Sequence, residues 1–170
     1  MPSVVVFAKD EDGLSTRNLH EWSLGRKIVF FFVPGAFTQT CSEQHLPGFI
    51  EHSEAFMNKG ADAIACLSVN DPHVMLAWGD QSGAAGKIVM LADPQAELAT
   101  ALGTNKDFGP PLGVRSKRCG FIANNGIVTY VHIEDPGELS GSSAIEMLAA
   151  LEAQKSICKP LLKGIPSWLI

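Results

Sequence analysis

The chain has 170 residues, of which 46% are hydrophobic and 18% are charged, and its net charge at pH 7 is −5. This composition predicts one ordered globular domain with a well-buried core and excludes a largely disordered chain. The negative charge argues against a nucleic-acid partner. No apolar run approaches the ~20 residues that cross a membrane. We also expect no signal peptide, because the start lacks a basic region followed by an apolar one.

In chain order, the sequence predicts strands at 3–7, 27–33, 61–69 and 87–92, with helices over about 41–58, 72–79 and 94–102. The second strand is apolar throughout and is expected to be central in the sheet. Pro47 is expected to distort the first helix. Asp71 and Pro72 are a good cap and first residue for the second helix.

After a loop at 103–111 the pattern changes. Strands at 118–123 and 127–133 flank Asn124-Asn125-Gly126, the strongest hairpin signal in the chain. Ser143 and Glu146 match a capping box for a helix to about residue 154. The order predicts an α/β, thioredoxin-like fold, in which helices flank a mixed central sheet and a β-hairpin precedes the closing helix. We expect residues 1–154 to form a single domain and 155–170 to form a C-terminal tail.

The four cysteines stand at positions 41, 66, 119 and 158, without a Cys-x-x-Cys pair. Such spacing is typical of free thiols in a reducing compartment, and it disfavours a disulfide framework and a structural zinc site. We therefore expect a cytoplasmic protein that uses no metal, flavin or haem. An organelle is the alternative, if a targeting segment has been removed.

Cys41 is the most informative residue, because a buried strand and a Pro-Gly turn bring it to the end of the sheet. Thr40 and Glu43 match a capping box that would make Cys41 the first helical residue. Unpaired N–H groups and the helix dipole favour a thiolate there. Glu43 opposes this effect, so a cation from elsewhere is needed. Lys117 and Arg118, at the start of the predicted hairpin, are the candidates.

The residues around Cys41 suggest a particular chemistry. Thr38 is expected to turn its hydroxyl into the same pocket, while Pro34 and Phe37 shield the pocket from water. A thiolate placed there can attack a peroxide oxygen and become a sulfenic acid. Donors from Thr38, Arg118 and backbone amides would then stabilise the charge on the leaving oxygen.

Pro34, Thr38 and Cys41 match a Pro-x-x-x-Thr-x-x-Cys signature. Together with the sequences of 33–38, 41–42 and 45–49, this signature resembles the type II (peroxiredoxin-five-like) subfamily of the peroxiredoxins. The stretches 67–72, 91–93 and 113–118 continue the resemblance, which covers roughly residues 3–151. It implies a thioredoxin fold, thiol-dependent reduction of hydrogen peroxide and organic hydroperoxides, and a homodimer. By the same match, Cys41 is the peroxidatic cysteine, Thr38 and Arg118 are the activating pair, and Pro34 is the shield.

The resemblance leaves the recycling step open. Animal-like members have a resolving cysteine near the closing helix, but the corresponding stretch 139–143 contains none. Cys66 is a possible resolving cysteine by its match to plant-like members, although its apolar neighbours favour a place in the core. We therefore expect glutathione or glutaredoxin to reduce Cys41 directly, with thioredoxin as the alternative. Cys119 should point away from Arg118 along its strand.

Two other functions are also compatible with the residues near Cys41, and the first of them involves His45. It lies four residues after Cys41 and therefore on the same helix face, so the pair could belong to a cysteine hydrolase with an imidazole base. A redox-sensing interaction module, which binds a partner according to the oxidation state of Cys41, is the second alternative. The family resemblance instead gives His45 a packing or hydrogen-bonding role.

Overall fold

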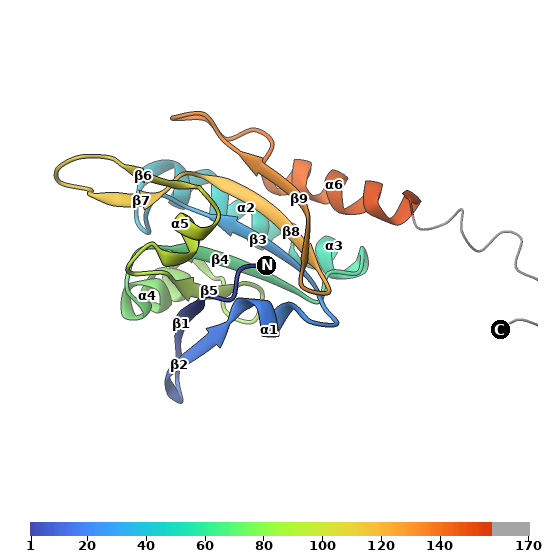
Figure 1. Ribbon diagram of the computed structural model, residues 1–170, viewed down its shortest axis with the longest axis horizontal. Helices are drawn as coiled ribbons and strands as arrows, with labels where there is room; N and C mark the ends of the chain where they lie inside the picture. The colour runs from blue at the N-terminus through green and yellow to red at the C-terminus, as the bar shows by residue number, and fades with distance from the viewer. Residues whose placement is uncertain (158–170) are drawn as a thin grey trace, which may run out of the picture.

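The computed structural model describes the backbone of residues 1–157 and the side chains of residues 1–154. A seven-stranded sheet has the order β2-β1-β5-β4-β3-β8-β9, and a second sheet pairs β6 with β7 (Figure 1). The strands are β1 Val5–Asp10, β2 Gly13–Asn18, β3 Lys27–Phe32, β4 Ala63–Ser68, β5 Val89–Ala92, β6 Asn105–Asp107, β7 Val114–Ser116, β8 Cys119–Asn124 and β9 Ile127–Ile133. The helices are α1 Leu19–Ser23, α2 Leu46–Glu51, α3 Ser53–Asn58, α4 Pro72–Ser82, α5 Glu97–Ala101 and α6 Ala144–Ile157.

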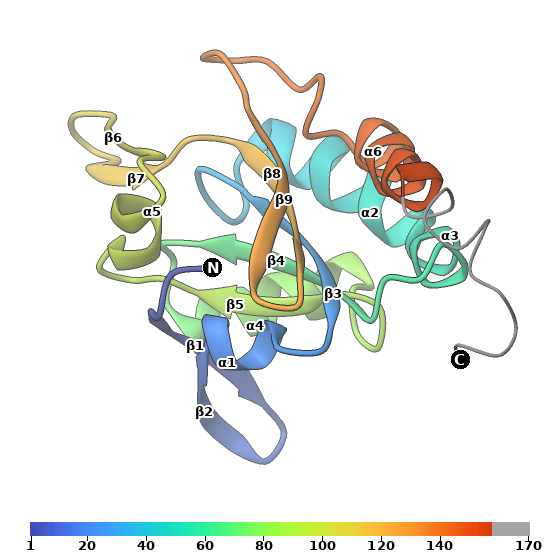
Figure 2. The same cartoon turned by 45° about the vertical axis from the view of Figure 1, so that its right-hand side comes forward.

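The sheet is mixed, as the order of the elements predicted. Strands β3, β4 and β5 are parallel, whereas β8 is antiparallel to β3 and β9 is antiparallel to β8. Strands β2 and β9 form the two edges of the sheet (Figure 2). The central place of β3 explains its unbroken apolar sequence, because Ile28 to Phe32 are all fully buried and both faces of the strand are covered.

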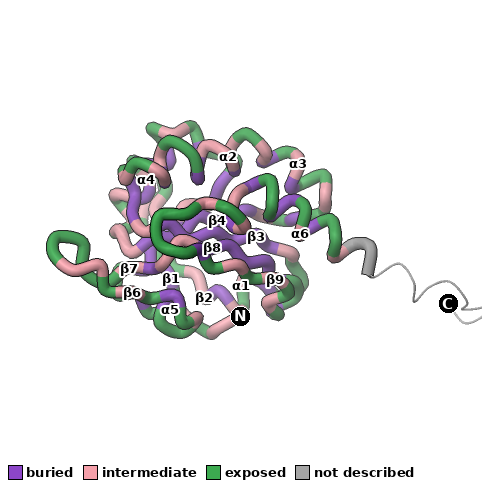
Figure 3. The backbone as a smooth tube through the Cα atoms, turned by 90° about the horizontal axis from the view of Figure 1, so that it is seen from above, coloured by how far each residue is buried: buried purple, intermediate pink, exposed green. Residues whose placement is uncertain are grey.

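Alternate side chains of β3 enter two separate cores. Val29 and Phe31 belong to the core beneath α2, α3, α4 and α6, while Phe30 and Phe32 belong to the core on the other face, beside α1 and α5 (Figure 3). Phe31 stacks on Phe49 of α2, with ring centres 3.9 Å apart and an interplanar angle of 1°. This stacked pair fixes α2, and the turn before it, against the central strand.

The structure adds small elements that the sequence pattern did not indicate. The acidic turn at 10–13 joins β1 to an edge strand, β2, and a short helix α1 follows. None of the side chains of β2 is fully buried, so no alternation of apolar and polar residues marked it. The predicted loop at 103–111 contains β6, which pairs with β7 over three residues.

The helix near Cys41 begins earlier than the predicted capping box. Gln39 and Thr40 are already helical, and Ser42 donates its N–H to the Thr38 carbonyl at 2.9 Å. Thr40 has helical backbone angles and makes no side-chain cap bond. The prediction that Thr40 is the N-cap and Cys41 the first helical residue is therefore wrong.

The distortion expected from Pro47 is present as a π-helical turn over Cys41–His45. There Leu46 donates its N–H to the Cys41 carbonyl, five residues earlier. Pro47 has no N–H, and its ring would collide with the carbonyl four residues before it in a regular helix, so the widened turn relieves a steric conflict. A break at His52, which separates α2 from α3, was not predicted.

Helices α4 and α6 begin where the sequence indicated, whereas α5 begins at Glu97, three residues later than predicted. The Asp71 side chain accepts the N–H groups of His73 and Val74 at the start of α4. Ser143 Oγ lies 3.5 Å from the Glu146 N–H at the start of α6. Helix α6 runs past residue 154 to Ile157, and Cys158 with the rest of the predicted tail lies outside the described residues. Among the described residues, no helix is long and apolar enough to span a membrane.

Candidate active site

Cys41 lies in the first helical turn after β3, and it is fully buried. The turn at 34–38 that leads to it is held from two sides. The Ala36 N–H donates to Asn70 Oδ1 at 2.8 Å, which ties the turn to the segment after β4. Thr38 Oγ1 donates to the Gly35 carbonyl at 2.8 Å. Because the hydroxyl proton of Thr38 is used in this way, its oxygen is left to accept a hydrogen bond from another molecule.

Arg115 is a residue of this region to which the sequence analysis gave no role. Its Nη1 donates to the Pro34 carbonyl and its Nε to the Leu112 carbonyl, each at 2.9 Å. A Cβ at Gly35 would stand 2.1 Å from Arg115 Nη1, so only glycine permits this approach. A single arginine in a three-residue strand has no local signal that shows which carbonyls it will reach.

Phe37, which the sequence analysis expected to shield the pocket from water, is 53% exposed. Its φ of 60° is uncommon for a residue with a large side chain. Pro34 is half-buried and, with Arg118, lines a cavity beside the turn.

Arg118 brings a permanent charge to the thiol, as the sequence analysis anticipated. Its Nη2 lies 3.5 Å from Cys41 Sγ, although the two residues are 77 positions apart. A thiolate and a guanidinium at this separation attract by about 5 kcal/mol at an effective dielectric constant of ~20. This contact sets a permanent positive charge directly beside the buried sulfur.

The same guanidinium also binds His45. Arg118 Nη1 lies 3.0 Å from His45 Nδ1, and His45 Nε2 lies 3.0 Å from the Ser142 carbonyl. A guanidinium can only donate and a carbonyl can only accept, so His45 is the neutral tautomer with its proton on Nε2. Burial, and then the charge of Arg118, lower the pKa of His45 to about 3, although the bond to Ser142 acts in the opposite direction.

This arrangement leaves His45 unsuited to the hydrolase chemistry considered from the sequence. A general base needs a free lone pair near the thiol, but the lone pair on Nδ1 already accepts a bond from Arg118. The packing and hydrogen-bonding role is confirmed. Arg118 therefore contacts both Cys41 and His45 through its guanidinium.

Comparisons with known proteins decide the family. The model of the Redoxin family matches residues 1–148. The chain is 47% identical over 149 residues to peroxiredoxin-2E-2, chloroplastic, of Oryza sativa subsp. japonica, across 85% of this chain and 66% of that protein. It is 42% identical over 148 residues to peroxiredoxin-2B of Arabidopsis thaliana, across 86% of this chain and 91% of that protein. This chain is a peroxiredoxin of the Redoxin family.

A solved structure agrees with this assignment. Reduced Prx3 of Vibrio vulnificus, in complex with hydrogen peroxide, superposes with a TM-score of 0.86 at 42% identity, over 89% of this chain and 95% of that one. The predicted thioredoxin-like fold is confirmed, and the peroxiredoxin has the thiol-dependent peroxidase activity of its family.

The other described cysteines of the peroxiredoxin lie in the cores. Cys66, in β4, is fully buried, and burial, followed by the nearby Cys41, raises the pKa of its thiol well above the ordinary value. Burial raises the pKa of Cys119 to about 12, against smaller opposing contributions from Ser116 and Phe32. Cys119 belongs to the core on the opposite face from Cys41, as its strand position predicted.

A cavity of about 450 Å³ lies beside Arg118. Pro34, Phe108 and Pro136 provide apolar surface. The lining also carries both signs of charge, from Lys106 and Lys117 and from Glu134, Asp135 and Glu138. It is a mixed surface that suits small oxygen-bearing molecules with an apolar part. Among the described side chains, no three His, Cys, Asp or Glu residues are grouped so that they could hold a metal ion.

The buried neutral state of His45 predicts a specific pH dependence of stability. The folded pKa is about 3, whereas an unfolded histidine titrates near ~6.5. As pH falls through this window the unfolded chain binds the extra proton, so stability falls by up to about 1.4 kcal/mol per pH unit. Urea unfolding between about pH 6 and pH 4.5 should therefore show a steeper loss in the parent protein than in His45→Asn.

His73→Asn is the matched control, because His73 is exposed. Its stability should follow the same slope as the parent protein. Parallel slopes in all three proteins would contradict a buried, neutral His45.

Proposed function

We propose that Cys41 is the peroxidatic cysteine and that it reduces hydrogen peroxide and organic hydroperoxides. The thiolate attacks the terminal peroxide oxygen, an S–O bond forms and the O–O bond breaks. Sulfur is oxidised by two electrons to a sulfenic acid, and the leaving hydroxide or alkoxide takes a proton from water. The observation that supports this proposal most strongly is the guanidinium 3.5 Å from the sulfur of Cys41.

Arg118, Thr38 and Pro34 complete the proposed site. Arg118 keeps the thiol ionised and donates hydrogen bonds to the peroxide as charge moves onto the leaving oxygen. Thr38 Oγ1 accepts a hydrogen bond from the peroxide O–H, because its own proton is directed at the Gly35 carbonyl. Pro34 covers the cavity next to Arg118 and limits the access of water. The structural neighbour from Vibrio vulnificus, which was solved with hydrogen peroxide, supports the choice of substrate.

Replacing Arg118 by methionine should cripple the reaction and leave the fold intact. Met is close to Arg in length but has no charge and no N–H donors, so the thiolate and the leaving oxygen both lose stabilisation. We expect the second-order rate constant with hydrogen peroxide to fall at least about 10²-fold, as measured by stopped-flow fluorescence.

Arg26→Met is the control, because it removes an exposed guanidinium at the turn before β3. It should react like the parent protein, and circular dichroism should be unchanged in both variants. A rate for Arg118→Met within twofold of the parent would remove Arg118 from the mechanism. Slow oxidation of the parent protein itself would favour the redox-sensing interaction module.

We infer that an external thiol regenerates Cys41 directly. A glutathione thiolate attacks the sulfenic sulfur, so that an S–S bond forms, the S–O bond breaks and the leaving hydroxide takes a proton from solvent to become water. A second thiol, from glutathione or glutaredoxin, then releases the Cys41 thiolate. Burial of Cys66 within β4 and the lack of a cysteine at 139–143 support this route. Thioredoxin remains the alternative donor.

Mass spectrometry after one equivalent of peroxide tests the reductant. We expect dimedone to label Cys41 alone, and added glutathione to replace this label by a mixed disulfide at Cys41. Cys66→Ser should turn over with glutathione and glutaredoxin at the parent rate. A dominant Cys41–Cys66 disulfide, or turnover with thioredoxin only, would overturn direct reduction by glutathione.

We propose that the peroxiredoxin forms a homodimer through the surface next to the active-site turn. Phe37, Leu112 and Val114 are large apolar residues that are 53%, 42% and 51% exposed. Arg115 joins their two segments, because it binds the carbonyls of both Pro34 and Leu112. Sedimentation should show a dimer that Phe37→Glu dissociates and Leu14→Glu, at the distant β2 edge, does not. A monomeric parent protein would refute this interface.

We also propose that the peroxiredoxin works in a reducing compartment. Free thiols suit the cytoplasm or a reducing organelle, and two relatives are named as chloroplastic.

A further inference from the structure

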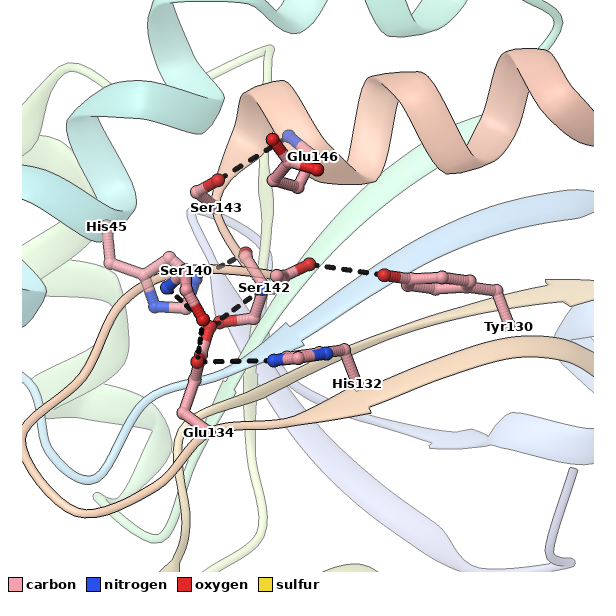
Figure 4. A network of polar contacts seen from close by, with 9 residues as sticks. His45, Tyr130, His132, Glu134, Ser140, Ser142, Ser143 and Glu146 are labelled. Carbon is pink, nitrogen blue, oxygen red and sulfur yellow. Dashed lines mark hydrogen bonds and ion pairs between the residues drawn. The ribbon is translucent and has the colours of Figure 1, made fainter.

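Glu134, just after β9, is a buried carboxylate that the proposed chemistry does not use. It is only 4% exposed. It accepts the N–H groups of Ser140 and Ser142, each at 2.8 Å, and their hydroxyls at 2.6 and 2.8 Å (Figure 4). His132 Nε2 lies 3.3 Å from the same carboxylate. The Glu134 N–H also donates to the Arg118 carbonyl at 2.9 Å.

These bonds turn the segment 135–143 back toward the active site. Glu134 holds Ser142 through both its N–H and its hydroxyl, which directs the Ser142 carbonyl at His45. His45 Nε2 donates to this carbonyl at 3.0 Å, and Figure 4 shows the two residues side by side. A continuous chain of polar contacts thus leads from Glu134 through Ser142, His45 and Arg118 to Cys41.

We propose that Glu134 is a positioning residue for the peroxidase site: by holding Ser142, it fixes the tautomer and orientation of His45 and thereby the guanidinium of Arg118 against Cys41. This inference rests on the proposed roles of Cys41 and Arg118. Arginine loses much rotamer freedom when it is held in one conformation, so a guanidinium that must face a thiolate needs a fixed partner. His45 supplies that partner only while its Nε2 proton has an acceptor.

The chemistry of the network requires a carboxylate at position 134. The four donors of Ser140 and Ser142 converge on two oxygens, and a glutamine would present an NH₂ group to some of them. Burial acts to raise the pKa of Glu134, but the hydrogen bonds from Ser140 and Ser142 outweigh it and bring the pKa to about 2. The carboxylate is therefore ionised throughout the neutral range, and it acts as a permanent acceptor.

Glu134→Gln tests the proposal with two readouts. Nitrogen-15 NMR of the histidines reports the tautomer of His45, and stopped-flow measures oxidation of Cys41. In the parent protein we expect a single Nε2–H tautomer. In Glu134→Gln we expect mixed tautomers and a loss of about tenfold in rate, which corresponds to ~1.4 kcal/mol.

Two controls separate positioning from general effects. Glu11→Gln removes an exposed carboxylate in the turn between β1 and β2 and should match the parent protein. Asp93→Asn removes a buried carboxylate that accepts the N–H groups of Leu98 and Ala99 in α5. It should lower stability without changing His45. An equal change of tautomer and rate in Asp93→Asn would overturn the proposal.

A double-mutant cycle gives the sharpest distinction. If Glu134 acts through His45, adding Glu134→Gln to His45→Asn should cause no further loss of rate. Independent, multiplicative losses would contradict the proposal. If Glu134→Gln does not fold, Ser142→Ala replaces it, because this change removes one donor to Glu134 and keeps the Ser142 carbonyl. It should then give a smaller loss of rate and a partial tautomer change, and a parent-like result would overturn the proposal.

The tautomer readout keeps this inference separate from the function itself. A slow reaction of the parent protein with peroxide would refute the role of Cys41. An unchanged His45 tautomer in Glu134→Gln would refute the role of Glu134 alone.

Discussion

A buried thiol is hard to ionise unless a positive charge or hydrogen-bond donors face it, and in this protein one guanidinium faces Cys41. Arg118 lies 3.5 Å from Cys41 Sγ, and the register of the sheet puts it there. Phe32, at the end of β3, pairs with Cys119, at the start of β8. The antiparallel pairing therefore brings the residue before Cys119 to the end of β3 from which the chain continues to Cys41. The position of the charge is a consequence of strand register.

His45 is the second neighbour of Arg118, and it must be uncharged to accept a hydrogen bond from the guanidinium. A protonated His45 would repel the guanidinium, whereas the neutral ring accepts a bond from it. Burial and the adjacent positive charge both favour the neutral ring, as its pKa of about 3 indicates. The guanidinium thus lies between a neutral acceptor, His45, and the sulfur that we propose to be anionic. The guanidinium is half-buried, and this partial removal from water strengthens its attraction to a thiolate, because attraction between opposite charges is weaker in water.

Much of this architecture could be predicted from local sequence. The apolar run of β3, the Asn-Gly turn between β8 and β9, and Asp71 before Pro72 each have a local physical cause, and all three are present. Thr40 shows the limit of such reasoning. Its capping-box pattern is correct in composition, but the turn begins the helix at Gln39, and Pro47 widens the next turn.

The site itself was predictable in part. Cys41 and Arg118 were found because each lies close to a well-marked strand. Cys41 follows the turn after β3, Arg118 directly precedes β8, and the two strands are neighbours in the sheet. Arg115, Ser142 and Glu134 were not given roles, because they act through backbone carbonyls and N–H groups. Almost every residue type carries these backbone groups, so no sequence pattern indicates which of them will form such a hydrogen bond. Only the tertiary fold shows which carbonyl meets which donor.

The ionisation of Cys41 in the folded protein is the most direct test of this account. Ultraviolet absorbance of the thiolate at neutral pH, measured as the difference between the parent protein and Cys41→Ser, reports it. The account predicts a difference close to one thiolate per chain, which disappears on unfolding because a free thiol is only about 3% ionised at pH 7. The absence of any difference at neutral pH in the folded protein would contradict it.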